Sequence, residues 1–326
     1  MQCNNCPRQC NAGRSAGKEG WCRLDDGLHV ASVCLHHGEE PPLSGERGIV
    51  NVFFEHCNMQ CIYCQNYDIS CNDAPARGMT SYDEVTDRIA ELLPHSEGNL
   101  GFVSPTHCVP QMKKIVEAVR ERGFTPTVVY NSNGYDSVAT VKSLEGIVDV
   151  WLPDFKYSDD RLAIKYSAAP GYRESALSAL REMVRQCGVT LHTNDRGIVM
   201  RGVIVRHLVL PGNTANSIGV LRVIADEISP NIHVSLMSQY YPAGKILKVN
   251  PGNTSFSEHE GINPDPGSCR NRTLSPEPLL RTLIKSEYDS IVDAFNSFGF
   301  SHGWLQDFES QTNYRPDFSK DNPFTL

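Results

Sequence analysis

The sequence predicts an α/β fold: an open, partial (β/α)6 TIM-like barrel, preceded by a small cysteine-rich segment and followed by a C-terminal extension. Two observations predict this fold. From residue 49 to about residue 242, apolar β-branched runs alternate with amphipathic helical segments, which is typical of parallel strands joined by helical crossovers. A polar stretch follows each run, at the strand ends where α/β barrels carry their functional groups. We expect three parts: 1–48, a barrel at 49–245 and an extension at 246–326.

Six strands with crossover helices are expected in the barrel. The strands are predicted at 49–54, 99–103, 125–130, 147–152, 202–210 and 232–237. The helices are predicted at 81–93, 110–122, 135–144, 160–166, 172–186 and 214–228. The first should begin after Ser81, because Ser81 and Glu84 form a capping-box pattern. A further helix is expected at 286–298, after a long loop at 250–271 rich in Pro, Gly, Ser and Asn.

The N-terminal segment holds one of two cysteine groups. Its four cysteines form the pattern C-x2-C-P-R-x-C-x11-C, and they are Cys3, Cys6, Cys10 and Cys22. Four thiolates make a complete tetrahedral set, which suits either zinc or a second iron–sulfur cluster. Because the segment is short and polar, the metal would supply its folding energy. The rest of the segment, 23–48, is expected to carry one short strand at 28–33. His36 and His37, near Cys34, could be ligands, but the favoured interpretation places them and Glu39–Glu40 in a solvated loop packed against the barrel mouth.

Composition limits the classes of partner and location. The chain has 326 residues, 12 cysteines and a formal net charge of −8. This charge argues against a general nucleic-acid or anionic-membrane binder. The N-terminus carries no apolar signal region, and no run of about 18 apolar residues is available to cross a membrane. Clustered cysteines in such a chain indicate metal thiolates in a reducing compartment, so we expect a cytoplasmic protein.

The second cysteine group follows the first barrel strand. Cys57, Cys61 and Cys64 have the spacing C-x3-C-x2-C directly after the run 49–54. Three thiolates in eight residues make a soft site, which selects zinc, cuprous copper or an iron–sulfur cluster. A 4Fe-4S cluster held by three cysteines keeps one iron without a protein ligand, and that iron can bind a non-protein group. The alternative is a structural zinc loop completed by a distant ligand.

With Tyr63 just before its last cysteine, this motif resembles the radical S-adenosylmethionine (SAM) superfamily. The resemblance covers 49–242, and within it the chain is most similar to the activating enzymes of pyruvate formate-lyase. Cys3–Cys10, with its C-x2-C-P-R-x-C pattern, and Cys64-Gln65-Asn66 resemble an uncharacterised branch of their homologues. The resemblance implies a 4Fe-4S cluster on the three cysteines, SAM on the open iron, and a flavodoxin- or ferredoxin-like one-electron donor. Reductive cleavage of SAM would give a 5′-deoxyadenosyl radical that abstracts hydrogen from a substrate.

The resemblance also implies residues that bind SAM. Tyr63 matches a residue beside the adenine, and the loop with Thr106 stands where the family has G-G-E and receives the amino group. The remaining positions match family residues near the methionyl carboxylate, the ribose or the active-site floor: Asn131, Asn133, Asp154 and Arg206. The side-chain chemistry agrees, since Arg206 can grip a carboxylate and the asparagines can bind hydroxyls. No catalytic residue is predicted. Cys71, Cys108, Cys187 and Cys269 are expected to be inert, with Cys108 within reach of the active site.

Three functions remain open on the sequence. The first is a radical SAM enzyme with an unidentified small molecule, peptide or protein as substrate. The second is an activase of a glycyl-radical enzyme, which needs an open barrel mouth to admit a protein loop. The extension at 246–326 favours a closed mouth. The third is a non-catalytic zinc or iron–sulfur scaffold or redox sensor.

Overall fold

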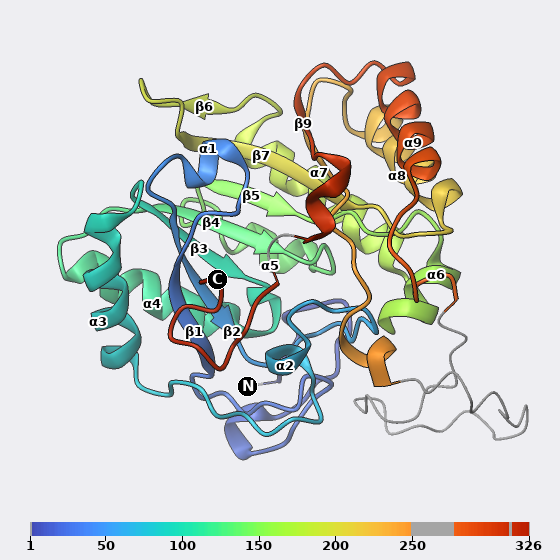
Figure 1. The fold of residues 1–326 in the computed structure, drawn as a ribbon. Helices are drawn as coiled ribbons and strands as arrows, with labels where there is room; N and C mark the ends of the chain where they lie inside the picture. Colours follow the sequence, from blue (N-terminus) through green and yellow to red (C-terminus); the bar gives the residue numbers. More distant parts are fainter. Residues whose placement is uncertain (1, 249–276, 313–314, 326) are drawn as a thin grey trace, which may run out of the picture.

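The computed structural model describes residues 2–248, 277–312 and 315–325, and it contains a curved, mostly parallel sheet (Figure 1). The strands follow the order β1-β2-β3-β4-β5-β7-β8-β9, with β6 paired to β7. All neighbours from β2 to β9 along this order are parallel, whereas β1 is antiparallel to β2. The predicted loop at 250–271, which includes Cys269, lies outside the described residues.

The six predicted barrel strands are all present. They are β2 (Ile49–Phe54), β3 (Asn99–Val103), β4 (Thr127–Ser132), β5 (Val150–Pro153), β7 (Val199–Leu208) and β8 (His233–Met237). The crossover helices are α3 (Tyr82–Leu92), α4 (Val109–Glu121), α5 (Val138–Lys142), α6 (Asp160–Ser167), α7 (Tyr172–Cys187) and α8 (Thr214–Glu227). The Ser81 side chain accepts a hydrogen bond from the Glu84 amide, which confirms the predicted cap of α3.

The sheet is wider than predicted, because one strand is added at each edge. β1 (Val30–His36), which was predicted as a short strand at 28–33 but not as part of the barrel sheet, pairs with β2, and β9 (Gly303–Leu305) pairs with β8. β9 was missed because a three-residue strand has no periodicity of its own and forms only where β8 offers an unpaired edge. A short antiparallel strand, β6 (His192–Thr193), extends β7, and helix α9 (Lys285–Ser297) packs beside α8 (Figure 1).

Alternation along the strands separates two apolar regions. One set of side chains, such as Val52, Phe102 and Val205, joins the larger cluster between the sheet and the helices. A smaller cluster fills one end of the inside of the sheet, with Leu43, Ile49, Val129 and other strand residues. Leu43 comes from the short helix α1 (Pro41–Ser44), which closes that end as a plug. Above the plug, the inward positions become polar, and they include Asn51, Asn131 and Arg206.

The loop before α1 corrects an expectation from the sequence. His36 and Glu40 are buried rather than solvated, because the chain turns inward after β1. Glu39 Oε1 accepts a hydrogen bond from Asn51 on β2 at 2.9 Å. The side chain of Glu39 therefore meets the polar inward positions of the strands. The prediction of a solvated loop is wrong for His36 and Glu40, whereas His37 is exposed.

The end of the chain crosses β1 and β2 (Figure 1). Asn322 donates to the Leu35 carbonyl of β1 at 2.9 Å. The Phe324 ring lies 4.0 Å from the His36 ring and 5.8 Å from the Phe53 ring, between centroids. Residues 315–325, here called the C-terminal tail, thus cover one edge of the sheet. Within the described residues, no helix has both the length and the apolar character needed to cross a bilayer.

Gly303 allows β9 to approach β8, and replacing it should detach this strand. A Cβ atom at Gly303, whose φ is +129°, would lie 1.9 Å from the Val234 carbonyl oxygen. We expect Gly303→Ala to cost about 3 kcal/mol or more, from backbone strain plus the clash. Gly299→Ala is the matched control, because Gly299 also has positive φ but its Cβ would meet no described atom within 4 Å. The control should cost about 1–2 kcal/mol. Equal losses of Tm in the two variants would contradict the role given to Gly303.

Candidate active site

A cavity of about 170 Å³ lies at the C-terminal ends of the strands. Its walls bring together the three cysteines of the second group, Cys57, Cys61 and Cys64, on the loop between β2 and α2 (Tyr67–Ser70). Most of the predicted SAM-binding residues also line it, and they are Tyr63, Asn131, Asn133, Asp154 and Arg206. The strand ends therefore place the thiols and the polar groups around one space, as expected for parallel strands.

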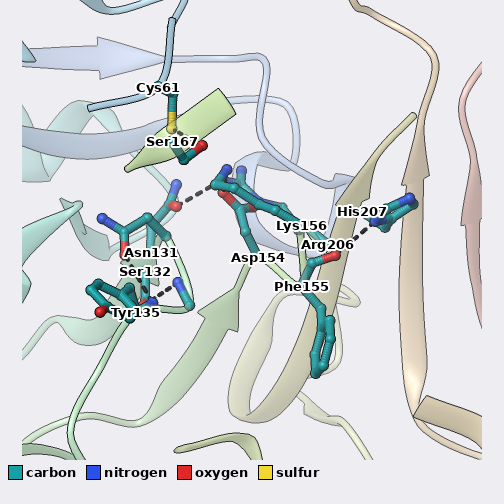
Figure 2. A network of polar contacts seen from close by, with 12 residues as sticks. Cys61, Asn131, Ser132, Tyr135, Asp154, Phe155, Lys156, Ser167, Arg206 and His207 are labelled. Carbon is teal, nitrogen blue, oxygen red and sulfur yellow. Dashed lines mark hydrogen bonds and ion pairs between the residues drawn. The ribbon is translucent and has the colours of Figure 1, made fainter. Parts of the chain in front are cut away.

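Each of the three sulfurs accepts a hydrogen bond from a polar side chain outside the cysteine motif. The pairs are Asn133 with Cys57 (3.3 Å), Ser167 with Cys61 (2.9 Å) and Ser70 with Cys64 (3.2 Å). Figure 2 shows the Ser167 hydroxyl pointing to the Cys61 sulfur. Donors aimed at sulfur stabilise a thiolate and tune a cluster bound by it. The three sulfurs thus share the surroundings of metal-bound thiolates.

The thiols of the second group do not converge on a single metal-ion position in the described residues. In the described part of the chain, no three His, Cys, Asp or Glu side chains converge on one metal-ion position. A cubane cluster does not need such convergence, because each thiolate binds a different iron. Burial raises the pKa of Cys57 to about 12 and that of Cys64 to about 11. Such thiols stay protonated until a positive centre compensates the thiolate charge.

Arg206 is at the centre of a buried polar network (Figure 2). Its Nε lies 3.1 Å from Asp154 Oδ1, its Nη1 3.0 Å from Glu39 Oε2 and its Nη2 2.7 Å from Asn131 Oδ1. Every guanidinium nitrogen therefore already binds a protein acceptor. The sequence suggested that Arg206 would hold a ligand carboxylate, whereas the structure engages it with two protein carboxylates.

Lys156 is a cavity residue that the sequence did not assign to the site. Its Nζ lies 2.5 Å from Asp154 Oδ2, so Asp154 bridges Lys156 and Arg206. Burial alone would raise the pKa of Asp154, but the two neighbouring cations lower it below its usual range. The carboxylate is therefore charged, and the ammonium of Lys156 interacts electrostatically with Cys61 and Cys64.

Of the two predicted SAM-binding residues Tyr63 and Thr106, Tyr63 lines the cavity and Thr106 does not. Tyr63 lines the cavity, and its hydroxyl is 2.6 Å from that of Tyr157. Thr106 is fully buried, and its hydroxyl donates to Asp136 at 2.7 Å instead of lining the cavity. Ser104, at the end of β3, lies in the cavity wall instead. The strand end is thus close to the site, but a different hydroxyl faces it.

The four N-terminal cysteines lie near one another and near Arg14. Cys22 interacts electrostatically with Cys3 and Cys10, and Cys6 interacts with Cys22 and Cys3. Arg14 is buried and donates to the carbonyls of Leu24, Asp25 and His107. These acceptors are neutral; the Asp25 carboxylate, whose pKa is lowered by His29 first and also by Arg14, interacts with the guanidinium at longer range. The thiols of Cys3, Cys22 and Cys108 also interact electrostatically with Arg14, and each can carry negative charge.

Cys108 belongs to this N-terminal region rather than to the cavity of the second cysteine group. It is fully buried, and Arg14, Cys22 and Cys3 are its charged or titratable neighbours. The sequence expectation that Cys108 could reach the active site is therefore wrong. Its chain position beside Thr106 was misleading, because Thr106 itself points away from the cavity.

Arg8 connects the two cysteine groups. Its Nε donates to the Asn58 carbonyl at 3.0 Å, directly after Cys57. Its Nη2 donates to the carbonyl of Ala168, next to Ser167. The guanidinium lies 3.6 Å from the centre of the Trp21 ring, within the N-terminal segment. Arg8 therefore links the N-terminal segment to the backbone on both sides of the Cys61–Ser167 contact.

Glu39, Ser70 and Ser167 are site residues that the sequence did not reveal. Glu39 reaches the site from before the barrel, and Ser167 reaches it from the end of α6. Neither position has a motif, because their contacts span more than 100 residues of sequence. Only Ser70 had a usable signal, since it follows Cys64 by six residues.

Comparisons with known proteins give relatives but no established activity. No protein-family model matches the chain. The chain is 28% identical over 260 residues to the uncharacterized protein MJ0674 of Methanocaldococcus jannaschii, covering 74% of this chain and 67% of that protein. It is 23% identical over 270 residues to the uncharacterized protein MJ0808 of the same organism, covering 77% and 74%.

Solved structures show a partial likeness in fold. TYW1 with a lysine-pyruvate adduct bound gives a TM-score of 0.44 at 11% identity, over 84% of this chain and 86% of that one. Methylornithine synthase (PylB) gives 0.43 at 16% identity, over 81% and 73%. Streptococcus suis SuiB bound to S-adenosylmethionine gives 0.40 at 10% identity, over 60% of this chain and 44% of SuiB. The chain thus spans less than half of SuiB, and the function is argued below from the site.

His207 positions the strand-end loop that carries Asp154 and Lys156. The ring is fully buried, with Nδ1 2.7 Å from the Phe155 carbonyl oxygen and Nε2 2.9 Å from Ser217 Oγ (Figure 2). Because the carbonyl only accepts, Nδ1 carries the proton, and Nε2 accepts from the Ser217 hydroxyl. Burial lowers the pKa of His207 to about 4.

Acid should therefore destabilise the fold through His207. The folded pKa lies below the unfolded value, so the stabilisation is complete above about pH 6.5 and is lost as pH falls through 4. The full loss is roughly 3 kcal/mol. We expect His207→Gln to be less stable than wild type at pH 7 but to lose less Tm between pH 6.5 and 4. His95→Gln, at an exposed histidine, should keep the wild-type acid dependence. An unchanged acid dependence in His207→Gln would contradict this assignment.

Proposed function

We propose that the protein is a radical SAM enzyme, with a 4Fe-4S cluster held by Cys57, Cys61 and Cys64. The observation that carries this proposal is the set of three hydrogen-bonded sulfurs at the end of β2, facing a cavity of polar groups. The three thiols leave one iron of a cubane for a non-protein ligand, and the C-x3-C-x2-C spacing supports the same assignment. When both are bound, the reduced cluster and SAM would together supply a 5′-deoxyadenosyl radical, which abstracts a hydrogen atom from the substrate.

The residues around the cavity match the polar groups of SAM. Asn131 and Ser104 offer donors and acceptors for an amino group or hydroxyls, and Lys156 offers a cation for a carboxylate. Tyr63 provides an aromatic surface beside the cysteines. Arg206 holds Asp154 and Asn131 in place, so we assign it a positioning role rather than direct binding of the carboxylate. In this division, the chain binds and orients the cofactor and keeps water out.

A small-molecule reaction fits this chain better than activation of a glycyl-radical enzyme. β9 and the C-terminal tail cover the side of the sheet between β8 and β1. An activase must admit a protein loop, and such a loop would have to displace these contacts. Substrates of modest size need no such displacement.

We also propose that Cys3, Cys6, Cys10 and Cys22 bind a second metal centre, either zinc or a cluster. The support is charge balance: the guanidinium of Arg14 is buried among carbonyls and thiols. An isolated buried charge is costly, and a centre with four thiolates is an anion that offsets it. In this assignment Arg14 stabilises the metal-bound state, and Arg8 connects it to the loop of the second group.

Anaerobic reconstitution tests the cluster assignment. We expect the wild-type chain to gain roughly four iron and four sulfide that depend on Cys57, Cys61 and Cys64. Single Cys→Ala changes at these positions should remove this iron and abolish 5′-deoxyadenosine formation from SAM and dithionite. Cys187→Ala is the control, because Cys187 is buried on α7, away from the cavity. If cluster-loaded wild-type protein forms no 5′-deoxyadenosine, the enzymatic proposal is wrong.

Arg8 tests the connection between the two cysteine groups. We expect Arg8→Ala to accelerate loss of iron from the second group severalfold, because it removes two hydrogen bonds to the backbone beside Cys57 and Ser167. Arg8→Lys should be intermediate, since lysine keeps the charge but not the fork of donors. Arg161→Ala, at an exposed arginine, should match wild type. The measurement is the decay of cluster absorbance during challenge with a chelator. Equal decay in Arg8→Ala and Arg161→Ala would refute the connection.

A further inference from the structure

A second cavity, of about 500 Å³, adjoins the one at the cysteines. The two cavities share walls, including Asn131, Arg206 and Gln239. The second cavity continues between β8, β9 and the loop before α1, where Ser235, Trp304 and Glu40 line it. Its volume is in the range of small-molecule sites. A molecule in this space would lie next to the proposed cluster and SAM.

The walls of the second cavity are acidic. Three carboxylic side chains line it, Glu39, Glu40 and Asp307, against one guanidinium, that of Arg206. Arg206 is already paired with Glu39 and with Asp154 from the first cavity. Burial lowers the pKa of His36, so this wall residue adds no positive charge at neutral pH. The surplus of carboxyl groups favours a cationic occupant, which would also stabilise the ionised form of Glu40.

Glu40 provides a specific point of contact. It is 8% exposed, and its Oε2 atom is buried without a hydrogen-bond partner among the described residues. Burial raises the pKa of Glu40; Arg206 opposes this shift, and Glu39 adds to it. A buried carboxyl with an unsatisfied oxygen costs stability in the free protein. A cation in the cavity against the Glu40 carboxyl would offset the cost by stabilising the ionised form.

The C-terminal tail and β9 limit the size of the occupant. Pro316 and Phe324 of the tail form part of the wall, together with Trp304 of β9. The tail is held by the hydrogen bond from Asn322 to the Leu35 carbonyl and by the contact of Phe324 with His36. Trp304 adds an aromatic ring, a group that attracts ammonium ions.

Building on the function proposed above, we propose that the second cavity is the substrate site, and that it takes a small molecule with a primary ammonium group bound at Glu40. The carboxylate of Glu40 accepts from the ammonium, and Trp304 packs against it. The tail and β9 keep this molecule against the cysteine cavity and exclude a folded protein partner.

Binding of a graded series of ligands tests the proposal in the full-length, cluster-loaded protein. The probes are putrescine, 4-amino-1-butanol and 1,4-butanediol, which have similar lengths and two, one and no ammonium groups. Calorimetry should show tighter binding of each amine than of the diol, by about tenfold or more. Glu40→Gln should abolish this preference, whereas Glu46→Gln, at an exposed glutamate, should keep it. Equal binding of amine and diol, absence of amine binding, or an unchanged preference in Glu40→Gln would overturn the proposal.

Stability of the free protein gives a second, ligand-independent test. Glu40 Oε2 is unsatisfied, although the carboxyl also has a hydrogen bond with Ser235. Because the unsatisfied oxygen should cost more than this bond contributes, Glu40→Leu should raise Tm by about 2 °C or more. A lower Tm would show that Glu40 serves the fold, and would overturn its role as a binding group. These tests do not involve SAM cleavage. Amine binding without 5′-deoxyadenosine formation would refute the radical chemistry alone, and the converse result would refute the ammonium site alone.

Discussion

The buried charge of Arg206 is the constraint on which the interior of the barrel depends. Its guanidinium binds Glu39 before the barrel, Asn131 on β4 and Asp154 after β5, so one side chain joins three separate parts of the chain. A buried ion pair contributes little net stability, but removing one partner leaves an uncompensated charge that costs about 3–5 kcal/mol. The network therefore fixes positions more than it adds stability. It holds the loop before α1 inside the barrel, where that loop separates the apolar plug from the polar cavities.

The same alternation of side chains that builds the sheet divides its interior into two zones. Ile49 and Val129 lie in the apolar plug, and two residues further along their strands Asn51 and Asn131 belong to the polar layer. Gly101 on the intervening strand has no side chain, and the Asn51 amide occupies the space where its Cβ would lie, with Oδ1 2.1 Å from that position. The plug prevents water from entering at one end, so charges above it act in a low-dielectric space, where electrostatic interactions are stronger.

The sequence predicted what is local and missed what is distant. Strands such as β2 and helices such as α4 were found because their periodicity lies within one segment. Cys57, Cys61 and Cys64 were found because a single loop carries them. Glu39 and Glu40 were misplaced, because their burial depends on Arg206, more than 160 residues later. Thr106 was assigned from its position in a loop, but side-chain direction is set by the hydroxyl–carboxylate contact with Asp136, which no local pattern records.

The donors to the three cysteine sulfurs have a consequence for the order of biosynthesis. Ser70 follows Cys64 closely in the chain. Asn133 and Ser167 come much later, because residues 71–132 separate Ser70 from Asn133. A ribosome therefore releases the cysteine loop well before the groups that stabilise it as thiolates. The tail that covers the neighbouring cavity is made later than all of these residues. The nascent chain thus passes through a stage in which the three cysteines are made but two of their hydrogen-bond donors are not. Under the cluster assignment proposed above, iron and sulfide would meet the least obstruction at that stage.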